Sequence, residues 1–221
     1  MSKNPCIAII DYGLGNLFSV KQACLSVHMD PIVTQDAEEI HSADGVILPG
    51  VGAFKRAMDA LQELDLVDTL IDVPDSGTPL IGICLGAQLL MNESYEFGHH
   101  DGLGLIPGYV ERLDKLTDVG SNTVPNVGWR RIQHNECTDF LIRNVDLFTN
   151  IKENEYFYFV HSYCIETDEQ NISAVTPYGE GKFCSAIVSD NVIGLQFHPE
   201  RSGEMGLQIY KNIRRMLLTS S

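Results

Sequence analysis

Short apolar segments alternate with amphipathic helical patterns through the first 90 residues, and this alternation limits the folds open to the chain. Strands are expected at residues 6–10, 31–34, 45–48 and 80–83. Between them, apolar residues recur at helical spacing: Leu17, Val20, Cys24 and Val27, then Ala53, Ala57, Ala60, Leu61 and Leu64. Strands that alternate with helices pair in parallel through right-handed crossovers, so this half is predicted to be α/β.

The second half has a different pattern. Strand-like runs cover residues 156–165 and 183–188, and a turn at residues 189–191 joins the latter to a run at 192–197, which indicates a hairpin. The final apolar residues keep helical spacing, which predicts a helix packed on the sheet. We therefore expect residues 1–221 to form a single three-layer α/β domain, with a mostly parallel central sheet, helices on both faces and an added β-hairpin region.

The composition excludes several classes of function. The net charge is -15, without a large Lys/Arg cluster, so the chain is not expected to bind nucleic acid. No apolar run approaches the length of a membrane span or a signal peptide, so we expect a cytoplasmic protein without a membrane partner. Its six cysteines, Cys137 among them, include no C-x-x-C pair, which is typical of reduced thiols rather than disulfides or a zinc site.

Cofactor and metal sites are not indicated either. Two glycine pairs follow strands, but the third glycine of the dinucleotide fingerprint is replaced by Phe18 in one case and by Lys55 in the other. The adjacent residues His99 and His100 fall in a glycine-flanked polar segment, where a solvated loop is expected rather than a metal centre. We predict no cofactor and no metal.

Gly82-Ile83-Cys84-Leu85-Gly86 is the segment that points to chemistry. A strand, a Gly-x-Cys-x-Gly turn and a helical pattern through Leu89, Leu90 and Met91 match a nucleophile elbow, in which the nucleophile adopts a strained backbone between two small residues. The following helix N-terminus favours the thiolate of Cys84.

A thiolate nucleophile needs a base, and His198-Pro199-Glu200 supplies one with an orienting carboxylate. Pro199 enforces an extended backbone at His198, so imidazole and carboxylate share a face. Oxyanion donors are available in Leu85 N–H and in the glycine-rich turn at residues 50–52. The residues thus predict a Cys/His/Glu triad.

These motifs, Gly82-Ile83-Cys84-Leu85-Gly86-Ala87-Gln88 and Gln196-Phe197-His198-Pro199-Glu200, resemble the class I, triad-type glutamine amidotransferase family. Further segments resemble the branch of glutaminase subunits that pass ammonia to a (β/α)8 cyclase in histidine biosynthesis. They are Asp11-Tyr12-Gly13 with Gly15-Asn16-Leu17, Pro49-Gly50-Val51-Gly52-Ala53-Phe54 and Tyr158-Phe159-Val160-His161-Ser162-Tyr163. The likeness runs over residues 9–202.

The resemblance implies a reaction and a set of roles. Cys84 would attack the side-chain amide of glutamine, His198 would protonate the departing ammonia, and Glu200 would orient His198. The other implied sites are substrate-binding Gln88, His161, Ser162 and Tyr163, and oxyanion or regulatory Gly50, Val51, Gly52 and Leu85. The (β/α)8 cyclase would form a heterodimer with this chain and receive ammonia through a channel.

One segment departs from that branch, which usually has Pro-His-Met or Ile-Gly-Trp-Asn where this chain has Pro125-Asn126-Val127-Gly128-Trp129-Arg130. The segment faces the partner in the family, so the resemblance places Asn126, Trp129 and Arg130, together with Asn16, at a partner interface. Three alternatives stay open: a paralogous subunit for amidino-sugar synthesis in surface polysaccharide, a stand-alone cysteine peptidase or γ-glutamyl hydrolase, and a catalytically inactive binding subunit.

Overall fold

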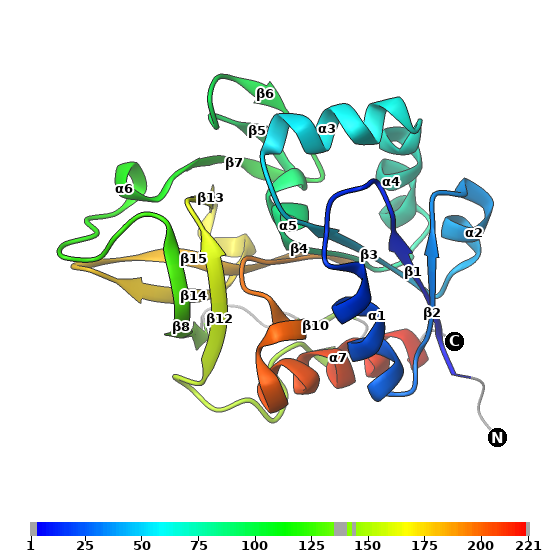
Figure 1. Cartoon of the computed structure of the whole chain (residues 1–221). Helices are drawn as coiled ribbons and strands as arrows, with labels where there is room; N and C mark the ends of the chain where they lie inside the picture. Colours follow the sequence, from blue (N-terminus) through cyan, green and yellow to red (C-terminus); the bar gives the residue numbers. More distant parts are fainter. Residues whose placement is uncertain (1–3, 135–140, 143–144, 220–221) are drawn as a thin grey trace.

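A mixed sheet runs through the centre of the protein (Figure 1). The computed structural model describes residues 4–134, 141–142 and 145–219. In that part of the chain the sheet has eight strands in the order β2-β1-β3-β4-β16-β15-β14-β9. Their bounds are β1 Cys6–Ile10, β2 Asp30–Thr34, β3 Gly45–Gly50, β4 Leu80–Cys84, β9 Gln133–His134, β14 Ile172–Tyr178, β15 Gly181–Ser189 and β16 Val192–Leu195. From β2 to β16 the neighbours are parallel, and from β16 to β9 they are antiparallel.

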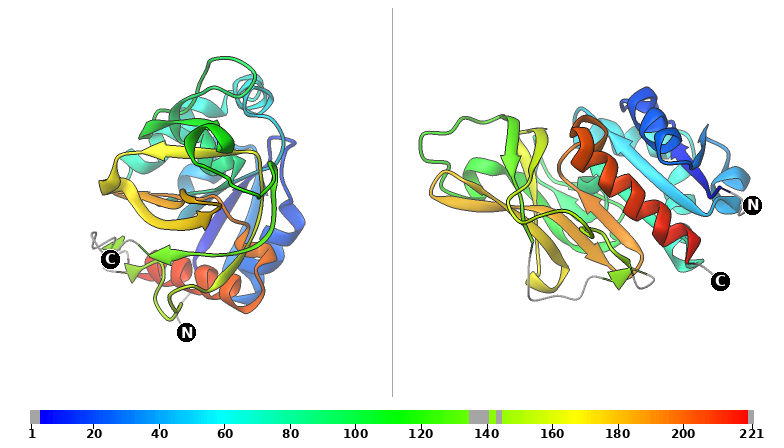
Figure 2. Two further views of the ribbon diagram at one scale, coloured as in Figure 1. Left: turned by 90° about the vertical axis from the view of Figure 1, so that its left-hand side faces the viewer. Right: turned by 90° about the horizontal axis from the view of Figure 1, so that it is seen from below.

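Helices cover both faces of this sheet. α1 (Leu17–Ser26) and α7 (Gly203–Leu218) lie on one face, whereas α3 (Phe54–Glu63), α4 (Leu66–Asp75) and α5 (Leu85–Leu89) lie on the other (Figures 1 and 2). The short helix α2 (Ala37–Ser42) follows β2. Alternation along β1 explains the two layers: Ile7 and Ile9 join the core under α1 and α7, and Ala8 and Ile10 join the core under α3 and α4.

Smaller sheets extend the molecule beyond the central sheet. β8 (Asn126–Arg131) pairs with β12 (Tyr156–His161), and β10 (Leu141–Ile142) pairs with β11 (Val145–Asp146). A third sheet has the order β13-β7-β5-β6, with bounds Tyr163–Thr167, Ile106–Arg112, Met91–Ser94 and His100–Asp101. The remaining helical segments are α6 (Leu113–Leu116), η1 (Glu169–Asn171) and η2 (Pro199–Arg201). No described helix is both long and apolar enough to cross a membrane.

The predicted α/β class, the central sheet and the helices on both faces are confirmed. The hairpin of β15 and β16 also forms, but it belongs to the central sheet because β16 pairs in parallel with β4. The helix after Cys84 is shorter than expected: it ends at Leu89, and Met91 begins β5.

The single strand expected at residues 156–165 is wrong. β12 ends at His161 and β13 begins at Tyr163, and the two pair with different sheets. Between them, the carbonyl of Ser162 accepts a hydrogen bond from Leu113 N–H at 2.9 Å, outside either ladder. Hydrophobic alternation continues across the break, which is why the pattern concealed it.

Because α5 packs closely on β3, position 86 requires a residue without a side chain, and this requirement can be tested. A Cβ at this position would collide with the carbonyl oxygen of Leu48 in β3, a backbone atom that cannot move aside without disturbing the sheet. We expect Gly86→Ala to lower the free energy of unfolding by about 3 kcal/mol or more, measured by chemical denaturation.

Gly77→Ala is the matched control. Gly77 has a φ of 83°, but a Cβ there would meet no atom within 4 Å. Only the left-handed backbone penalty of about 1–2 kcal/mol applies. Equal losses for both variants would contradict the close-packing explanation.

Candidate active site

Cys84 stands at the junction of β4 and α5. Its φ of 54° and ψ of -106° are strained for a residue with a side chain. The turn also needs a small residue at Gly82, because a Cβ there would lie 2.6 Å from the carbonyl oxygen of Gly86. The observed strand, turn and helix therefore have the geometry of a nucleophile elbow, with the thiol at the C-terminal edge of the sheet.

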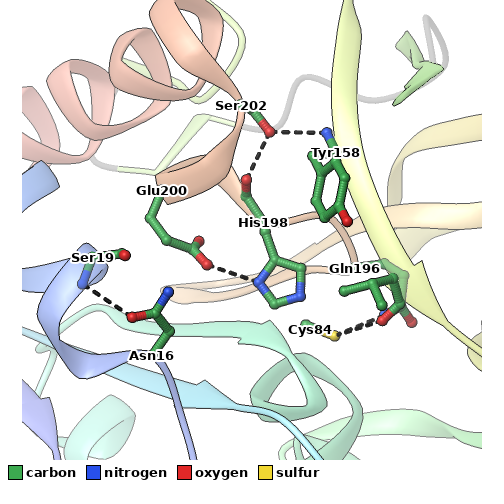
Figure 3. A network of polar contacts seen from close by, with 9 residues as sticks. Asn16, Ser19, Cys84, Tyr158, Gln196, His198, Glu200 and Ser202 are labelled. Atoms are coloured by element: carbon green, nitrogen blue, oxygen red, sulfur yellow. Dashed lines mark hydrogen bonds and ion pairs between the residues drawn. The ribbon is translucent and has the colours of Figure 1, made fainter. Parts of the chain in front are cut away.

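His198 and Glu200 lie beside this thiol (Figure 3). His198 Nδ1 and Glu200 Oε1 are 2.8 Å apart, and the two side chains are only 4% and 1% exposed. His198 Nε2 has no hydrogen-bond partner among the described residues, and Figure 3 shows it directed toward the sulfur of Cys84. The imidazole thus separates a carboxylate from a thiol, which is the arrangement of a nucleophile, a base and an orienting group.

The backbone around His198 is anchored to β12. His198 N–H donates to the carbonyl of Tyr158 at 2.9 Å. The hydroxyl of Ser202 donates to the carbonyl of His198 at 2.7 Å and accepts from Tyr158 N–H at 3.0 Å (Figure 3). Because these bonds hold both sides of the loop, the position of the imidazole is set by the backbone as well as by Glu200.

The charges in this cluster favour a protonated imidazole. Burial alone would lower the pKa of His198, but the negative charge of Cys84, with Glu200 in support, raises it to about 10. The cysteines outside the cluster lie in environments that disfavour the thiolate. Burial raises the pKa of Cys24 to about 12 and raises the pKa of Cys164 and of Cys184 well above the ordinary value. These three thiols are therefore protonated at neutral pH, whereas Cys84 lies beside the imidazole of His198.

Cys24, Cys84, Cys164 and Cys184 are free thiols, and Cys137 lies outside the described residues. No group of three or more His, Cys, Asp or Glu side chains in the described ranges could hold a metal ion. His99 instead contacts Glu93 at 2.6 Å on the surface, and His100 lies in β6 rather than in the expected loop.

A cavity of about 380 Å³ opens over Cys84. Eight of the sequence-predicted residues line it: Val51, Gly52, Cys84, Leu85, Gln88, His161, Ser162 and Tyr163. The break between β12 and β13 supplies the last three, so the interruption that the sequence pattern concealed forms one wall of the site. Gly50 lies at the edge of the sheet, where it is in register with Cys84.

Glu96 also lines the cavity, although sequence reasoning missed it. Its buried carboxylate accepts a hydrogen bond from Phe54 N–H. Burial raises the pKa of Glu96, and that hydrogen bond opposes the shift. Nothing local in the sequence distinguishes this Glu from its acidic neighbours, because the cavity around it is assembled from distant segments.

Gln196 is the second missed residue. Its Nε2 lies 3.7 Å from Cys84 Sγ, and its Oε1 accepts from Gln88 Nε2 at 3.0 Å. A signal was present, because Gln196 is two residues before His198 in extended chain and therefore shares its face.

A chain of hydrogen bonds connects the cavity wall to β8. Gln88 Nε2 donates to the carbonyl of Tyr163 at 2.9 Å, and His161 Nδ1 contacts the same carbonyl at 2.8 Å. His161 Nε2 contacts Asn126 Nδ2 at 3.0 Å, and Asn126 Oδ1 accepts from Arg130 Nε at 3.0 Å. Burial lowers the pKa of His161 to about 4, so this ring is neutral and both of its nitrogens are used within the protein.

The residues that the resemblance placed at a partner interface lie outside the cavity. Trp129 is 49% exposed and packs edge-on against Tyr158, whereas Asn126 is fully buried behind it. Arg130 is half-buried, with its guanidinium over the ring of Tyr178. Asn16 caps α1 by accepting a hydrogen bond from Ser19 N–H, next to Glu200 in Figure 3.

The electrostatic coupling between Cys84 and His198 can be measured directly. We expect Cys84→Ala to lower the pKa of His198, because burial then acts with less opposing negative charge. The readout is a pH titration of the histidine ring resonances by NMR. Cys24→Ala, which removes a buried thiol elsewhere, serves as the control and should leave that titration unchanged. A pKa that is the same in wild type and Cys84→Ala would contradict a charged sulfur beside the ring.

Comparison with known proteins places this geometry in a family. The family model Glutamine amidotransferase class-I matches residues 8–215 of the chain. Imidazole glycerol phosphate synthase subunit HisH of Bacillus cereus (strain G9842) is 44% identical over 208 residues, covering 94% of this chain and 93% of that protein. The protein of the same name from Bacillus thuringiensis (strain Al Hakam) is 40% identical over 213 residues, covering 96% of each.

Solved structures share the fold at low sequence identity. A putative GMP synthase subunit from Thermoplasma acidophilum has a TM-score of 0.68 at 16% identity, covering 99% of this chain and 96% of that one. PurLQS from Thermotoga maritima has a TM-score of 0.69 at 18% identity, covering 95% and 97%. The family match spans the elbow, the cavity and the His198 loop, and the chain belongs to the class I glutamine amidotransferase family.

Proposed function

We propose that this chain is a glutaminase subunit that hydrolyses glutamine to glutamate and ammonia. The ammonia then passes to a (β/α)8 cyclase subunit that forms imidazole glycerol phosphate in histidine biosynthesis, in the cytoplasm. The proposal rests on the buried pair of His198 and Glu200, whose Nδ1 and Oε1 atoms are 2.8 Å apart, beside Cys84 with its strained backbone. The relatives named as the HisH subunit, at 40–44% identity, support the choice of branch.

Acylation begins with the Cys84 thiolate, which attacks the side-chain amide carbon of glutamine. A carbon–sulfur bond forms and the amide oxygen becomes an oxyanion. The protonated His198 donates its Nε2 proton to the amide nitrogen, the carbon–nitrogen bond breaks, and ammonia leaves. A γ-glutamyl thioester remains on Cys84.

Deacylation uses the same groups in reverse. Neutral His198 takes a proton from water, and the resulting hydroxide attacks the thioester carbon. The carbon–sulfur bond then breaks, releasing glutamate and restoring the thiolate beside the imidazolium. Glu200 holds the ring in the tautomer that presents Nε2 to both steps.

The cavity supports recognition of glutamine. Burial raises the pKa of the Glu96 carboxyl, and the Phe54 N–H and His100 oppose this shift only in part, so the α-ammonium group of glutamine would complete its environment. Gln88 already uses its amide nitrogen toward Tyr163 and Gln196, which leaves its carbonyl oxygen for the substrate. The wall formed by residues 161–163 closes the other side.

The oxyanion would be stabilised by two backbone amides. Leu85 N–H begins α5 directly after the nucleophile, and the turn at residues 50–52 borders the cavity through Val51 and Gly52. Gly52 has a φ of 111°, a conformation that glycine adopts at low cost. The turn can therefore reorient its amides without strain, which is the basis for regulation by a partner.

A partner surface is supported by exposed aromatic and cationic side chains near the triad. The guanidinium carbon of Arg201 lies 4.3 Å from the centroid of the Tyr158 ring. The same ring packs against Trp129 on β8, which is 49% exposed. Phe18, which is 72% exposed, lies in α1, and Asn16 caps that helix on the other side of Glu200. Aromatic residues and arginine are enriched at the centres of protein interfaces.

Substitutions in the triad test the chemistry. We expect Cys84→Ala and His198→Asn each to reduce kcat for glutamine hydrolysis by about 10⁶-fold, to background, and Glu200→Gln to cost less, about 10⁴-fold. The measurement is glutamate release by the purified variants, with thermal unfolding as a check on the fold. Turnover at the wild-type rate in Cys84→Ala would rule out the covalent mechanism. Absence of turnover in the wild-type chain would instead indicate an inactive binding subunit.

Glu96→Gln is the contrasting variant for binding. Glutamine at this position keeps an acceptor for Phe54 N–H but removes the charge. We expect KM for glutamine to rise by about 10-fold or more while kcat changes little, because a charge-assisted contact of about 1.5–3 kcal/mol is lost. A fall in kcat at constant KM would assign Glu96 to the chemistry instead.

The isolated chain should hydrolyse glutamine slowly, because an oxyanion donor held out of place costs about 10²–10³ in rate. We expect the imidazole-forming cyclase together with its nucleotide substrate to restore that factor. Glutamate release is measured for the chain alone, with the cyclase, and with the cyclase plus its substrate.

Three outcomes would redirect the proposal. Equal rates in all mixtures would remove the gating role of the turn. Stimulation only by an amidino-sugar pathway partner would replace the histidine branch, with Asn126 and Arg130 as the first residues to test. Efficient release of amines from γ-glutamyl peptides without a partner would indicate a stand-alone hydrolase.

A further inference from the structure

Tyr12 lies two residues after the end of β1 and contacts the turn that the proposed mechanism uses for the oxyanion. Its side chain is buried, with 3% exposed, and its hydroxyl donates a hydrogen bond of 2.8 Å to the carbonyl of Pro49. Pro49 is the residue before Gly50, where β3 ends and the turn at residues 50–52 begins. A tyrosine from the loop after β1 therefore holds the backbone at the end of the neighbouring strand β3.

The contact is close to both amide donors proposed for the oxyanion. A Cβ built on Gly50 would lie 2.6 Å from the Tyr12 hydroxyl, 2.9 Å from Leu85 Cβ and 2.9 Å from Gly86 N. Glycine at position 50 thus lets the hydroxyl, the turn and the first residues of α5 meet. The three features form one packed unit behind Cys84.

Because the peptide bond is planar, the hydrogen bond from Tyr12 to the Pro49 carbonyl restricts the orientation of the whole Pro49–Gly50 peptide unit. A peptide unit is planar and trans, so a carbonyl held in one direction fixes the following N–H in the opposite direction. Tyr12 holds the carbonyl of Pro49, and the Pro49–Ile83 and Gly50–Cys84 register holds the strand. The unit between Pro49 and Gly50 is then fixed, and rotation is left to the units after Gly50.

We propose that Tyr12 is a positioning residue for the oxyanion turn: its hydroxyl fixes the Pro49–Gly50 peptide and confines reorientation to the Val51 and Gly52 amides. The inference rests on the proposed function, because an oxyanion forms only if Cys84 attacks an amide. Without the hydroxyl, the Pro49–Gly50 peptide would also rotate. The Val51 and Gly52 amides would then point toward the oxyanion for a smaller fraction of the time.

The Tyr12 hydroxyl is protonated at neutral pH. Burial, and secondarily the negative charge of Cys84, raise the pKa of Tyr12 far above the neutral range. The donor to Pro49 is therefore permanent, and the constraint does not depend on pH in the working range of the triad.

Tyr12→Phe removes the oxygen and keeps the ring. We expect kcat for glutamine hydrolysis to fall about 3- to 10-fold, the factor that corresponds to one hydrogen bond of roughly 0.5–1.5 kcal/mol, with KM changed less than about twofold. The experiment uses the full chain with its stimulating partner. A second readout is the rate of Cys84 alkylation by iodoacetamide, which needs the thiolate but no oxyanion donor; it should stay unchanged.

Tyr178→Phe is the matched control. The Tyr178 hydroxyl is also buried and donates to a backbone carbonyl, that of Thr123 at 2.6 Å, in a segment separate from the oxyanion turn. Its loss should cost stability, seen in thermal unfolding, without lowering kcat. An equal fall in kcat for both variants would show a general effect of lost packing and would overturn the inference.

Two further results would overturn it. An unchanged kcat in Tyr12→Phe would mean that the turn needs no anchor. A parallel fall in kcat and in alkylation rate would mean that Tyr12 acts on Cys84 itself. If the wild-type chain with its partner releases no glutamate, the proposed function fails first, and this outcome is distinct from equal turnover by wild type and variant.

Discussion

The left-handed backbone of Cys84 is the constraint on which the site depends. A non-glycine residue at a φ of 54° costs about 1–2 kcal/mol, and it persists only where the surroundings leave no alternative. Here β4 is paired on both sides, with β3 and with β16, up to the turn itself. Gly82 and Gly86 let α5 pack against the sheet immediately after the turn. The pairing of β4 with its two neighbours and the packing of α5 thus stabilise the strained backbone of Cys84 and keep its thiol at the cavity.

Charge then distinguishes Cys84 from the buried cysteines Cys164 and Cys184, which supports the proposed role of Cys84 as the nucleophile. The chain carries a net charge of -15, and a thiolate in such a protein needs a local cation. His198 supplies it, because Cys84 and Glu200 together outweigh the effect of burial and raise its pKa. Cys164 and Cys184 are buried without a cationic group among the causes that shift their pKa, so they remain thiols. Reactivity follows from placement, since the side-chain chemistry is the same in all of them.

The hydrogen bonds behind the cavity join the proposed catalytic groups to β8. Asn126 donates to neutral His161 and accepts from Arg130. Through Tyr163, Gln88 and Gln196 the same set of bonds reaches Cys84. Because buried polar groups that are all satisfied hold their positions, this network fixes the cavity wall. Asn126 and Arg130, which the resemblance placed at a partner interface, therefore also belong to the hydrogen bonds behind the cavity.

Local patterns were sufficient for much of the fold and for the choice of the proposed triad. Gly82, Cys84 and Gly86 indicated the elbow because a strained turn needs small neighbours within two residues, and Pro199 brought His198 and Glu200 onto one face through backbone rules alone. The alternation of strands and helices in the first half predicted the parallel sheet for the same reason: side-chain periodicity is a property of consecutive residues.

Only the tertiary structure decided the rest. The division of residues 156–165 at Ser162 depends on which sheet each half joins, and alternation continues unchanged across it. Glu96, Gln196 and the contact of Tyr12 with Pro49 acquire their roles from neighbours that are 37 to 112 residues away in the chain. Such contacts exist only after the layers have packed. By itself, then, the sequence determined the α/β alternation of the first half and the proposed triad, because both follow from neighbouring residues, whereas packing determined the cavity and the groups around the proposed reacting atoms.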